Sequence, residues 1–263
     1  MNIIISRLKL TVRYFRLYIK EKLEFPIEGV MSIIDFMVNI FSIIVFWISM
    51  KNINVNFIGW SYEMIVLLVG YNFLATGVNS IFFGFRDIEY KIISGEFDTM
   101  LSRPVSPFVQ IVLSRLNFFY ILLNLLVGIV AIIYSAVFFD YNIIHIFSAI
   151  WISITSSISL GLLYAMFSLL AFKFGKIYSA RELAFSIATA RNYPIDIFPK
   201  ALYNLFIYVI PLGLMSTIPA KVSVGEYLPE KYLLFSTLAM FTFLILYIFL
   251  SKRALLKYKS VGN

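Results

Sequence analysis

The residues that could take part in catalysis are few and lie far apart in the chain. Among 263 residues there are one histidine and no cysteine, which excludes disulfides, thiolate nucleophiles and cysteine-based metal sites. His145 lies five residues after Asp140, in a loop expected outside the membrane. This pair offers too few ligands to hold a metal ion. We therefore expect neither a catalytic nor a metal site on this chain, and no enzyme activity.

A nucleotide site is not expected either. A phosphate-binding loop has the pattern Gly-x-x-x-x-Gly-Lys-Ser/Thr, whose backbone N–H groups surround the phosphates. The chain has a single Gly-Lys pair, Gly175-Lys176, with Leu170 in place of the first glycine and Ile177 in place of the serine or threonine. The chain is thus expected to bind no cofactor of its own.

The composition indicates a membrane protein. Hydrophobic residues make up 61% of the chain and charged residues 14%, whereas soluble domains contain about a quarter charged residues. Crossing a hydrocarbon layer of about 30 Å takes about 20 apolar residues in a helix. We predict an all-α integral membrane protein of six transmembrane helices in one domain, 1–263. Five of the spans are clear: Ile27–Met50, Met64–Phe85, Phe108–Phe139, Asn142–Phe172 and Tyr232–Ser251.

Two segments of the sequence could each form the fifth span in chain order. Ala201–Ala220 is uncharged and long enough to cross, but Pro211 and Pro219 interrupt it. The segment Ile177–Tyr193 is less apolar. It contains three charged residues, Arg181, Glu182 and Arg191.

The basic residues predict the orientation of the chain. With both termini in the cytoplasm and Ala201–Ala220 as the fifth span, 19 of the 22 lysines and arginines lie inside, and Lys51, Lys221 and Lys231 lie outside. With Ile177–Tyr193 as the fifth span, 17 of the 22 lysines and arginines lie inside. Lysine and arginine collect on the cytoplasmic side of membrane proteins, so the net charge of +8 requires no nucleic-acid partner. We predict a multi-pass protein of the plasma membrane.

Asp35 is the acidic residue that lies well inside a predicted span. Ionisable groups at such depth are costly and tend to mark pathways or partners. The carboxylate has two possible roles: it reaches the inner headgroups or another helix, or it lines a translocation cavity. Secondary transporters usually carry several such groups and a matching internal repeat, which we do not find. Asp35 is our candidate for the cavity.

The N-terminal segment 1–25 is predicted to form an amphipathic interfacial helix. A basic stripe lies beside an apolar one, and both follow helical spacing. The basic stripe is Lys9, Arg13, Arg16 and Lys20, and the apolar one is Ile5, Leu8, Val12, Phe15 and Ile19. Such a helix lies at the inner headgroups, where it either anchors the chain on membrane lipid or docks a cytoplasmic partner.

Two ladders of small residues allow helices to approach closely in lipid. Gly70, Gly77 and Gly84 recur every seven residues, and a second ladder recurs every four. The second ladder is Ser153, Ser157, Gly161 and Ala165. Both ladders fit packing within the chain or a seam between two copies.

The inner loop 86–107 is predicted to hold a short helix between two spans. Ser94 is placed to cap it, acidic residues occupy its first turn, and Pro104 ends it. We expect its apolar residues to be exposed and to insert into a partner's groove, although a plain connector has the same geometry. The candidate residues are Glu96, Phe97, Met100, Leu101 and Arg103.

This loop also carries a family resemblance. The segment Ser94-Gly-Glu-Phe-Asp-Thr-Met-Leu-Ser-Arg-Pro-Val-Ser106 resembles the Gly-Glu-Leu/Phe-Asp-x-x-Leu-x-Arg-Pro-Val/Leu-Ser motif of ABC transporter permeases in the type-2 exporter superfamily, in a six-span branch long labelled uncharacterised. Two further segments, Tyr193-Pro-Ile-Asp-Ile-Phe-Pro199 and Ile218-Pro-Ala220 with Tyr227-Leu-Pro229, resemble the second conserved region of that branch.

The resemblance implies an exporter subunit of a bacterium. It implies that the 94–103 helix couples to two separate ABC ATPase subunits, which bind ATP and Mg, and that the N-terminal helix lies against them. It also implies a second permease, identical or a sister chain, a fifth span at about 177–193 and a re-entrant external hairpin at 194–230. The substrate class stays open among a drug, a lipid and a hydrophobic peptide. The alternatives are an accessory or immunity-type membrane binding protein, and a transferase, for which paired acids or histidines are missing.

Overall fold

The computed structural model describes residues 12, 13, 16, 17, 19, 20, 24, 26–52 and 59–258, and every regular element in this part of the chain is a helix. Lys9 lies outside the described residues. In chain order the elements are α2 (Pro26–Asn52), α3 (Tyr62–Asn79), η1 (Ser80–Asp87), α4 (Ile88–Ile93), α5 (Glu96–Leu101), α6 (Pro107–Ser114), α7 (Phe118–Phe138), α8 (Ile143–Ser168), α9 (Ala171–Phe174), α10 (Tyr178–Ala188), η2 (Thr189–Asn192), η3 (Ile195–Ile197), α11 (Lys200–Tyr208), α12 (Thr217–Ser223) and α13 (Pro229–Lys257).

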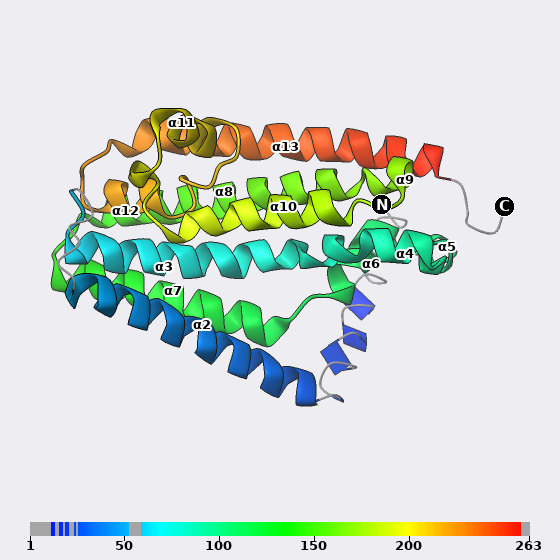
Figure 1. Ribbon diagram of the computed structural model, residues 1–263, viewed down its shortest axis with the longest axis horizontal. Coiled ribbons are helices and arrows are strands. Elements are labelled where there is room, and N and C mark those ends of the chain that lie inside the picture. Colours follow the sequence, from blue (N-terminus) through cyan, green and yellow to red (C-terminus); the bar gives the residue numbers. More distant parts are fainter. Residues whose placement is uncertain are drawn as a thin grey trace.

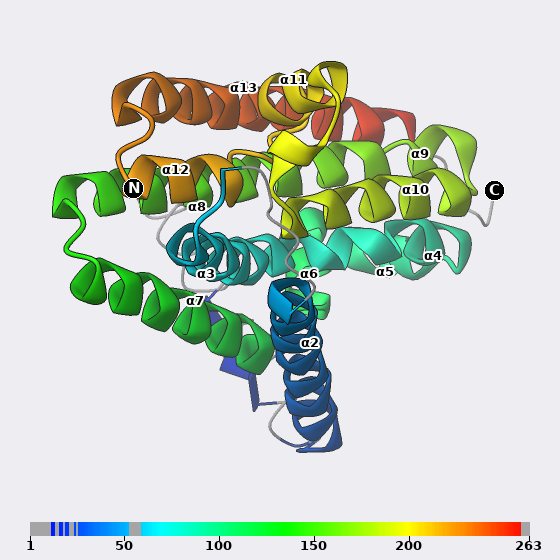
Figure 2. The same ribbon diagram turned by 60° about the vertical axis from the view of Figure 1, so that its left-hand side comes forward.

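The long helices form one elongated bundle. In Figure 1, α3, α7, α8, α10 and α13 run along its length, and α2 lies at its edge beside α7. Figure 2 shows α2 leaning away from the other long helices. Five helices in the described part are long and apolar enough to cross a membrane, which confirms the class. They are Gly29–Trp47, Tyr62–Ile93, Phe118–Phe138, Ile143–Phe174 and Pro229–Lys257.

The two ends of the bundle differ in charge. We call the end where α4, α5, α9 and the last turn of α13 lie the basic end (Figure 1). Lysines and arginines of these elements and of the adjoining loops gather there, whereas α12 and the first turn of α13 at the opposite end carry Lys221 and Lys231. The basic end holds Arg86, Lys91, Arg103, Arg115, Lys173, Lys176, Arg181, Lys252, Arg253 and Lys257.

The predicted continuous span Phe108–Phe139 is wrong in one respect. The chain leaves the helix after Ser114 and begins a new one, α7, at Phe118. The side chain of Asn117 accepts a hydrogen bond from the backbone N–H of Tyr120 at 3.1 Å, which satisfies a donor in the first turn of α7. The short helix α6 therefore packs against η1, and α7 alone forms the span.

The segment 201–220 is not one helix. Helix α11 ends at Tyr208 and α12 begins at Thr217, with an irregular turn between them. Pro211 has no N–H for a helical hydrogen bond, so a span over Ala201–Ala220 does not form. The other segment is helical, since α10 and η2 together run from Tyr178 to Asn192.

The turn before α12 and the helix itself lie inside the bundle. Helix α12 packs against α8 and α3, and its Ile218, Ala220 and Val222 are fully buried. Two hydrogen bonds of 2.7 Å hold the segment: Ser153 Oγ donates to the Met215 carbonyl, and the Tyr71 and Ser223 hydroxyls bond to each other. This half-length helix therefore belongs to the core of the bundle.

Both ladders of small residues serve packing within the chain. A Cβ added at Gly77 would lie 2.9 Å from Leu125 of α7, and one added at Gly84 would meet the Ile111 carbonyl of α6. On α8, the Ser157 carbonyl accepts a hydrogen bond from Asn79 at 3.1 Å, and Gly161 lies against the Phe82 ring. The ladders are thus occupied by the chain's own helices and do not form a seam between copies.

Candidate functional site

The predicted inner-loop helix is present as α5, at the basic end of the bundle. It begins one residue later than the Ser94 cap predicted, because Gly95 adopts the left-handed conformation, with φ of 75°. Glycine takes this conformation without steric cost, and it lets α4 and α5 meet at a sharp corner. Ser94 Oγ still lies 3.4 Å from the N–H of Glu96. The loop is therefore a fixed helical corner.

The expectation that Phe97 and Met100 are exposed is wrong. Phe97 is 0% exposed and Met100 is 5% exposed. The Phe97 ring lies 5.0 Å, centroid to centroid, from both Phe172 of α9 and Tyr258 after α13. Burial raises the pKa of the Tyr258 hydroxyl to about 12, with the nearby Asp98 carboxylate as a second cause. Phe97 and Met100 therefore fix α5 to its own chain, and they are not free to enter a partner's groove.

The interior at this end forms what we call the aromatic cluster. Phe108 of α6 lies 6.1 Å from Tyr247 of α13 and 6.5 Å from Phe172, measured between ring centroids. The cluster thus connects α5 with α6, α9 and α13. Its members are Phe85, Phe97, Phe108, Phe172, Tyr247 and Tyr258.

The predicted polar residues of the loop form bonds within it. Glu96 pairs with Lys91 at 2.8 Å, and Arg103 donates a hydrogen bond to Gln110 at 3.3 Å. Gln110 is buried, and its amide N–H₂ donates to the carbonyls of Met100 and Val105 at 2.9 and 2.8 Å. Sequence reasoning missed Gln110, since a single glutamine in an apolar stretch gives no sign of which carbonyls it reaches.

A smaller exposed face remains on the corner. Tyr90, Ile93 and Leu101 are 68%, 45% and 43% exposed, respectively. We call these three residues the α4–α5 face. A pocket of about 330 Å³ beside it is lined by Asp87, Tyr90, Lys91, Glu96, Ser114 and Arg115. Apolar side chains with charged groups at their border are typical of a docking surface.

The described part of the N-terminal segment is consistent with a helix at a surface. Arg13, Arg16 and Lys20 are helical and exposed. Val12 and Leu17 are 48% and 60% exposed, so apolar side chains are also available to lipid or a partner. The role of the basic stripe stays a prediction.

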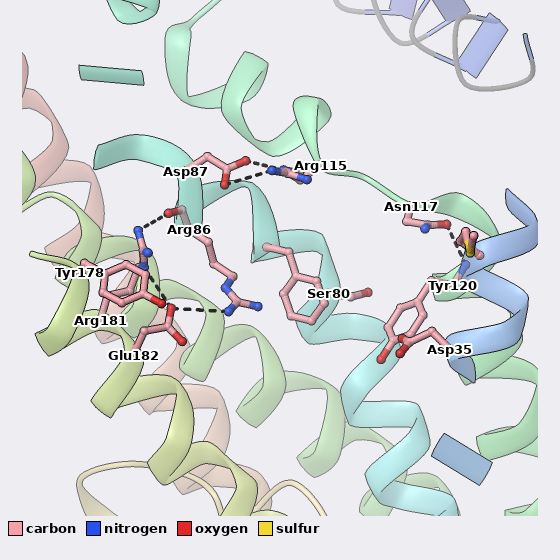
Figure 3. Close-up of a pocket in the computed structure, with 12 residues that line it drawn as sticks. Asp35, Ser80, Arg86, Asp87, Arg115, Asn117, Tyr120, Tyr178, Arg181 and Glu182 are labelled. Atoms are coloured by element: carbon pink, nitrogen blue, oxygen red, sulfur yellow. Dashed lines mark hydrogen bonds and ion pairs between the residues drawn. The ribbon is translucent and has the colours of Figure 1, made fainter. Parts of the chain in front are cut away.

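A charged pocket of about 840 Å³ opens between α2, η1 and α10 (Figure 3). Arg181 bonds Glu89 at 3.4 Å, and Arg86 lies 3.6 Å from Glu182. Arg115 pairs with Asp87 across the pocket wall. These pairs explain how α10 carries Arg181 and Glu182, because each charge has an opposite charge close by.

A second pocket of about 530 Å³ lies deeper among the helices, and we call it the membrane pocket. Asp35 and Tyr120 line both pockets, which places Asp35 at their junction. The polar lining of the membrane pocket comprises Asp35, Asn39, Ser42, Asn72, Thr76, Tyr120, Asn124, Arg191, Asn192 and Tyr193. A polar cavity within a membrane bundle can hold a polar part of a ligand.

The sequence model of the ABC-2 family transporter proteins matches residues 33–262, from α2 past the end of α13. The chain belongs to this family. It is therefore the permease component of an ABC transporter, a multi-pass membrane protein that associates with an ABC ATPase. A comparison with curated proteins finds no significant match.

The permease carries one functional candidate that the sequence analysis did not single out as a site. Arg191, in η2, was named only as one of three charged residues in a possible fifth span, and the structure shows that it lines the membrane pocket. The signal that could have found it was its position as an ionisable residue in a predicted span. In the described residues, no group of three or more histidine, aspartate or glutamate side chains could hold a metal ion.

Proposed function

We propose that this permease moves a substrate outward through the plasma membrane of a bacterium, driven by ATP that separate ABC ATPase subunits hydrolyse. Two such subunits would bind ATP and Mg, and a second permease, identical or a sister chain, would complete the transporter. The observation that carries the proposal is the α4–α5 corner, a rigid exposed structure at the basic end with its own aromatic interior. The substrate class is a drug, a lipid or a hydrophobic peptide.

The proposed mechanism uses the connections of the corner. An ATPase seated on the α4–α5 face would displace α5 when it closes on ATP. The rings of Phe97, Phe172 and Tyr258 lie in direct contact, and close-packed interiors transmit displacements rather than absorb them. The displacement would therefore reach α9 and α13. Through Phe108 and Phe85 of the aromatic cluster it would also reach η1, which lines the charged pocket. The candidate coupling residues are consequently the exposed Tyr90, Ile93 and Leu101, with Glu96 and Arg103 holding the loop.

We further propose six spans, with both termini and the basic end in the cytoplasm. Helix α10 and η2 would form the fifth span, and 194–230 would form a hairpin that re-enters from outside. Two observations support this arrangement: α12 is buried but only seven residues long, and the basic residues favour one end. Broken helices are tolerated at membrane depth where protein surrounds them.

The orientation is testable because the natural chain has no cysteine. Single cysteines at Ser102 and at Lys200, both exposed, are expected to react differently with a membrane-impermeant maleimide added to intact cells. Lys200→Cys, in the proposed external hairpin, should be labelled, and Ser102→Cys should be protected until the cells are opened. Labelling of Ser102→Cys in intact cells would overturn the cytoplasmic placement of the loop, and protection of Lys200→Cys would overturn the external hairpin.

The docking face is testable by one substitution and a matched control. Leu101→Arg is expected to reduce the amount of ATP-hydrolysing subunit that co-purifies with the permease by more than tenfold, since an apolar anchor at an interface commonly contributes about 2 kcal/mol. Leu256→Arg is the control, because Leu256 is 86% exposed on α13 at the same end. The measurement is vanadate-sensitive ATP hydrolysis per mole of permease.

Equal hydrolysis in both variants would contradict the docking face. A wild-type permease that carries no ATPase at all would favour an accessory binding protein instead. The thermal unfolding midpoint of Leu101→Arg should equal that of the wild type, because this side chain is 43% exposed.

A further inference from the structure

Arg191 carries a positive charge on a half-buried side chain that lines the membrane pocket. Its guanidinium donates a hydrogen bond to Thr76 Oγ1 at 3.1 Å, and Thr76 lies near the middle of the candidate span Tyr62–Ile93. The Arg191 carbonyl accepts a hydrogen bond from Ser216 at 2.8 Å, so the neighbouring turn fixes η2 in place. The charge is therefore held at a defined position in the membrane pocket.

This charge has no counter-ion among the residues that the structure describes. Arg191 makes no ion pair there, and its buried Nε has no hydrogen-bond partner. Asp35 lines the same pocket from α2, but it forms no ion pair with Arg191 in the described structure. Asp196 pairs with Lys221 at 3.0 Å, and Glu89 pairs with Arg181. An unpaired guanidinium in a low-dielectric interior is costly. The pocket therefore presents a guanidinium that can accept an anionic group.

We propose that the membrane pocket binds the anionic group of an amphipathic ligand, a single phosphate or carboxylate, with Arg191 as its anchor. The inference rests on the proposed function, in which this ligand is the transported substrate. A guanidinium presents paired N–H donors that match the two oxygens of such a group. Here Nε is free to donate, and Asn72 and Asn192, joined by a 2.8 Å hydrogen bond, border the site.

The rest of the pocket limits the ligand further. The Asp35 carboxylate lies on the α2 wall of the same pocket, so a second negative charge on the ligand would be repelled. The ligand is therefore a monoanion or a zwitterion. The remaining lining is apolar and fits an alkyl chain; it comprises Val38, Ile43, Phe46, Trp47, Val69 and Phe73.

The test uses Trp47 as a reporter, because it lines the pocket and the chain has three tryptophans. In a Trp60→Phe, Trp151→Phe background, dodecyl phosphate is titrated into the full-length permease in neutral maltoside micelles, and Trp47 emission is followed. The titration is done at pH 5, where this phosphate group carries a single negative charge because its second pKa is about 6. We expect a saturable change, at least tenfold weaker in Arg191→Gln. Lys231→Gln, which removes a charge outside the pocket, should bind as the wild type does.

Two further arms keep the proposal open to failure. Dodecyltrimethylammonium controls for partition into micelles and should give no saturable change. Asp35→Asn should bind dodecyl phosphate at least twofold more tightly, and this variant answers the question even where Arg191→Gln does not fold. Wild-type affinity in folded Arg191→Gln, unchanged or weaker binding in Asp35→Asn, or equal binding of the cationic amphiphile would each overturn the proposal.

Added lipid distinguishes the two sources of the anion. In the same neutral maltoside micelles, added phosphatidylglycerol should abolish dodecyl phosphate binding if the site takes a lipid headgroup, and should leave it unchanged if the site takes a free amphiphile. Both results support an anion site. Absence of binding in a permease that still carries an active ATPase would refute this inference alone. Binding without any associated ATPase would refute the proposed function alone.

Discussion

Replacing Phe97 with alanine is expected to destabilise the permease by about 3–5 kcal/mol, the range for removing a buried phenylalanine ring. The ring is 0% exposed and contacts Phe172 and Tyr258, so its loss leaves a cavity where α5, α9 and the end of α13 meet. The measurement is the thermal unfolding midpoint of the purified permease in detergent. Phe97→Leu should lie between the wild type and the alanine variant.

The control is Ile93→Ala on the adjoining helix, since Ile93 is 45% exposed and its truncation leaves no cavity. This variant should unfold at the wild-type temperature and still weaken ATPase association, because Ile93 belongs to the α4–α5 face. A Phe97→Ala permease as stable as the wild type, but without its ATPase, would mean that Phe97 acts at the interface and not in the interior.

Gly128→Leu is expected to abolish the folded bundle. A Cβ at this position would lie 2.6 Å from the backbone nitrogen of Leu74 and 2.8 Å from the carbonyl oxygen of Gly70. These are backbone atoms of α3, so no side chain can move aside, and α3 and α7 would have to separate. Overpacking inside a core costs typically about 1–3 kcal/mol where side chains can shift, and the cost here is larger because they cannot.

The readout for Gly128→Leu is the yield of monodisperse protein on size-exclusion chromatography, with Gly128→Ala expected to be intermediate. Gly29→Ala is the matched control, because a Cβ there meets nothing closer than 3.8 Å, the Phe119 ring. Normal yield and unfolding temperature for Gly128→Leu would show that α3 and α7 do not approach as closely as described.

Long apolar runs predicted the membrane class and the places of the clear spans. This prediction succeeded because a helix that crosses hydrocarbon must form its backbone hydrogen bonds internally and be apolar over its length. Each span can therefore be recognised from its own stretch of sequence. The break between α6 and α7 was missed. Arg115 and Asn117 are polar residues in an otherwise apolar run. They mark the place where one helix ends and the next begins, with Asn117 as the N-cap of α7.

The inner loop 86–107 was predicted to hold a short helix, but two of the apolar side chains expected to be exposed, Phe97 and Met100, are buried, whereas Leu101 is exposed. In a helix of six residues, the spacing of apolar side chains defines a face and does not say what covers it. The residues that cover Phe97 are Phe172 and Tyr258, far along the chain. Only the three-dimensional arrangement brings them together, so periodicity could not separate a partner's groove from the chain's own interior.

The membrane pocket lay beyond sequence reasoning for the same reason. Asp35 was singled out by its depth in a span, and the structure places it on the wall of both pockets. Arg191 was noted only as a charged residue in a possible membrane span. Its significance depends on which acids do not reach it, and that is a property of how α2, α3, α7 and η2 meet.

One wall of the membrane pocket is α2, and this wall is loosely held. Only 6% of the residues in its span Gly29–Trp47 are buried, and it touches the bundle through ring pairs such as Phe36 with Phe73, 6.0 Å apart, and Phe46 with Tyr193, 5.5 Å apart. Because little packing opposes its displacement, we expect α2 to move away from the pocket at a lower cost in energy than the other long helices. A substrate would then enter the membrane pocket sideways from the lipid, and the distance that α2 moves, rather than a rigid cavity, would set the size of the largest molecule that passes.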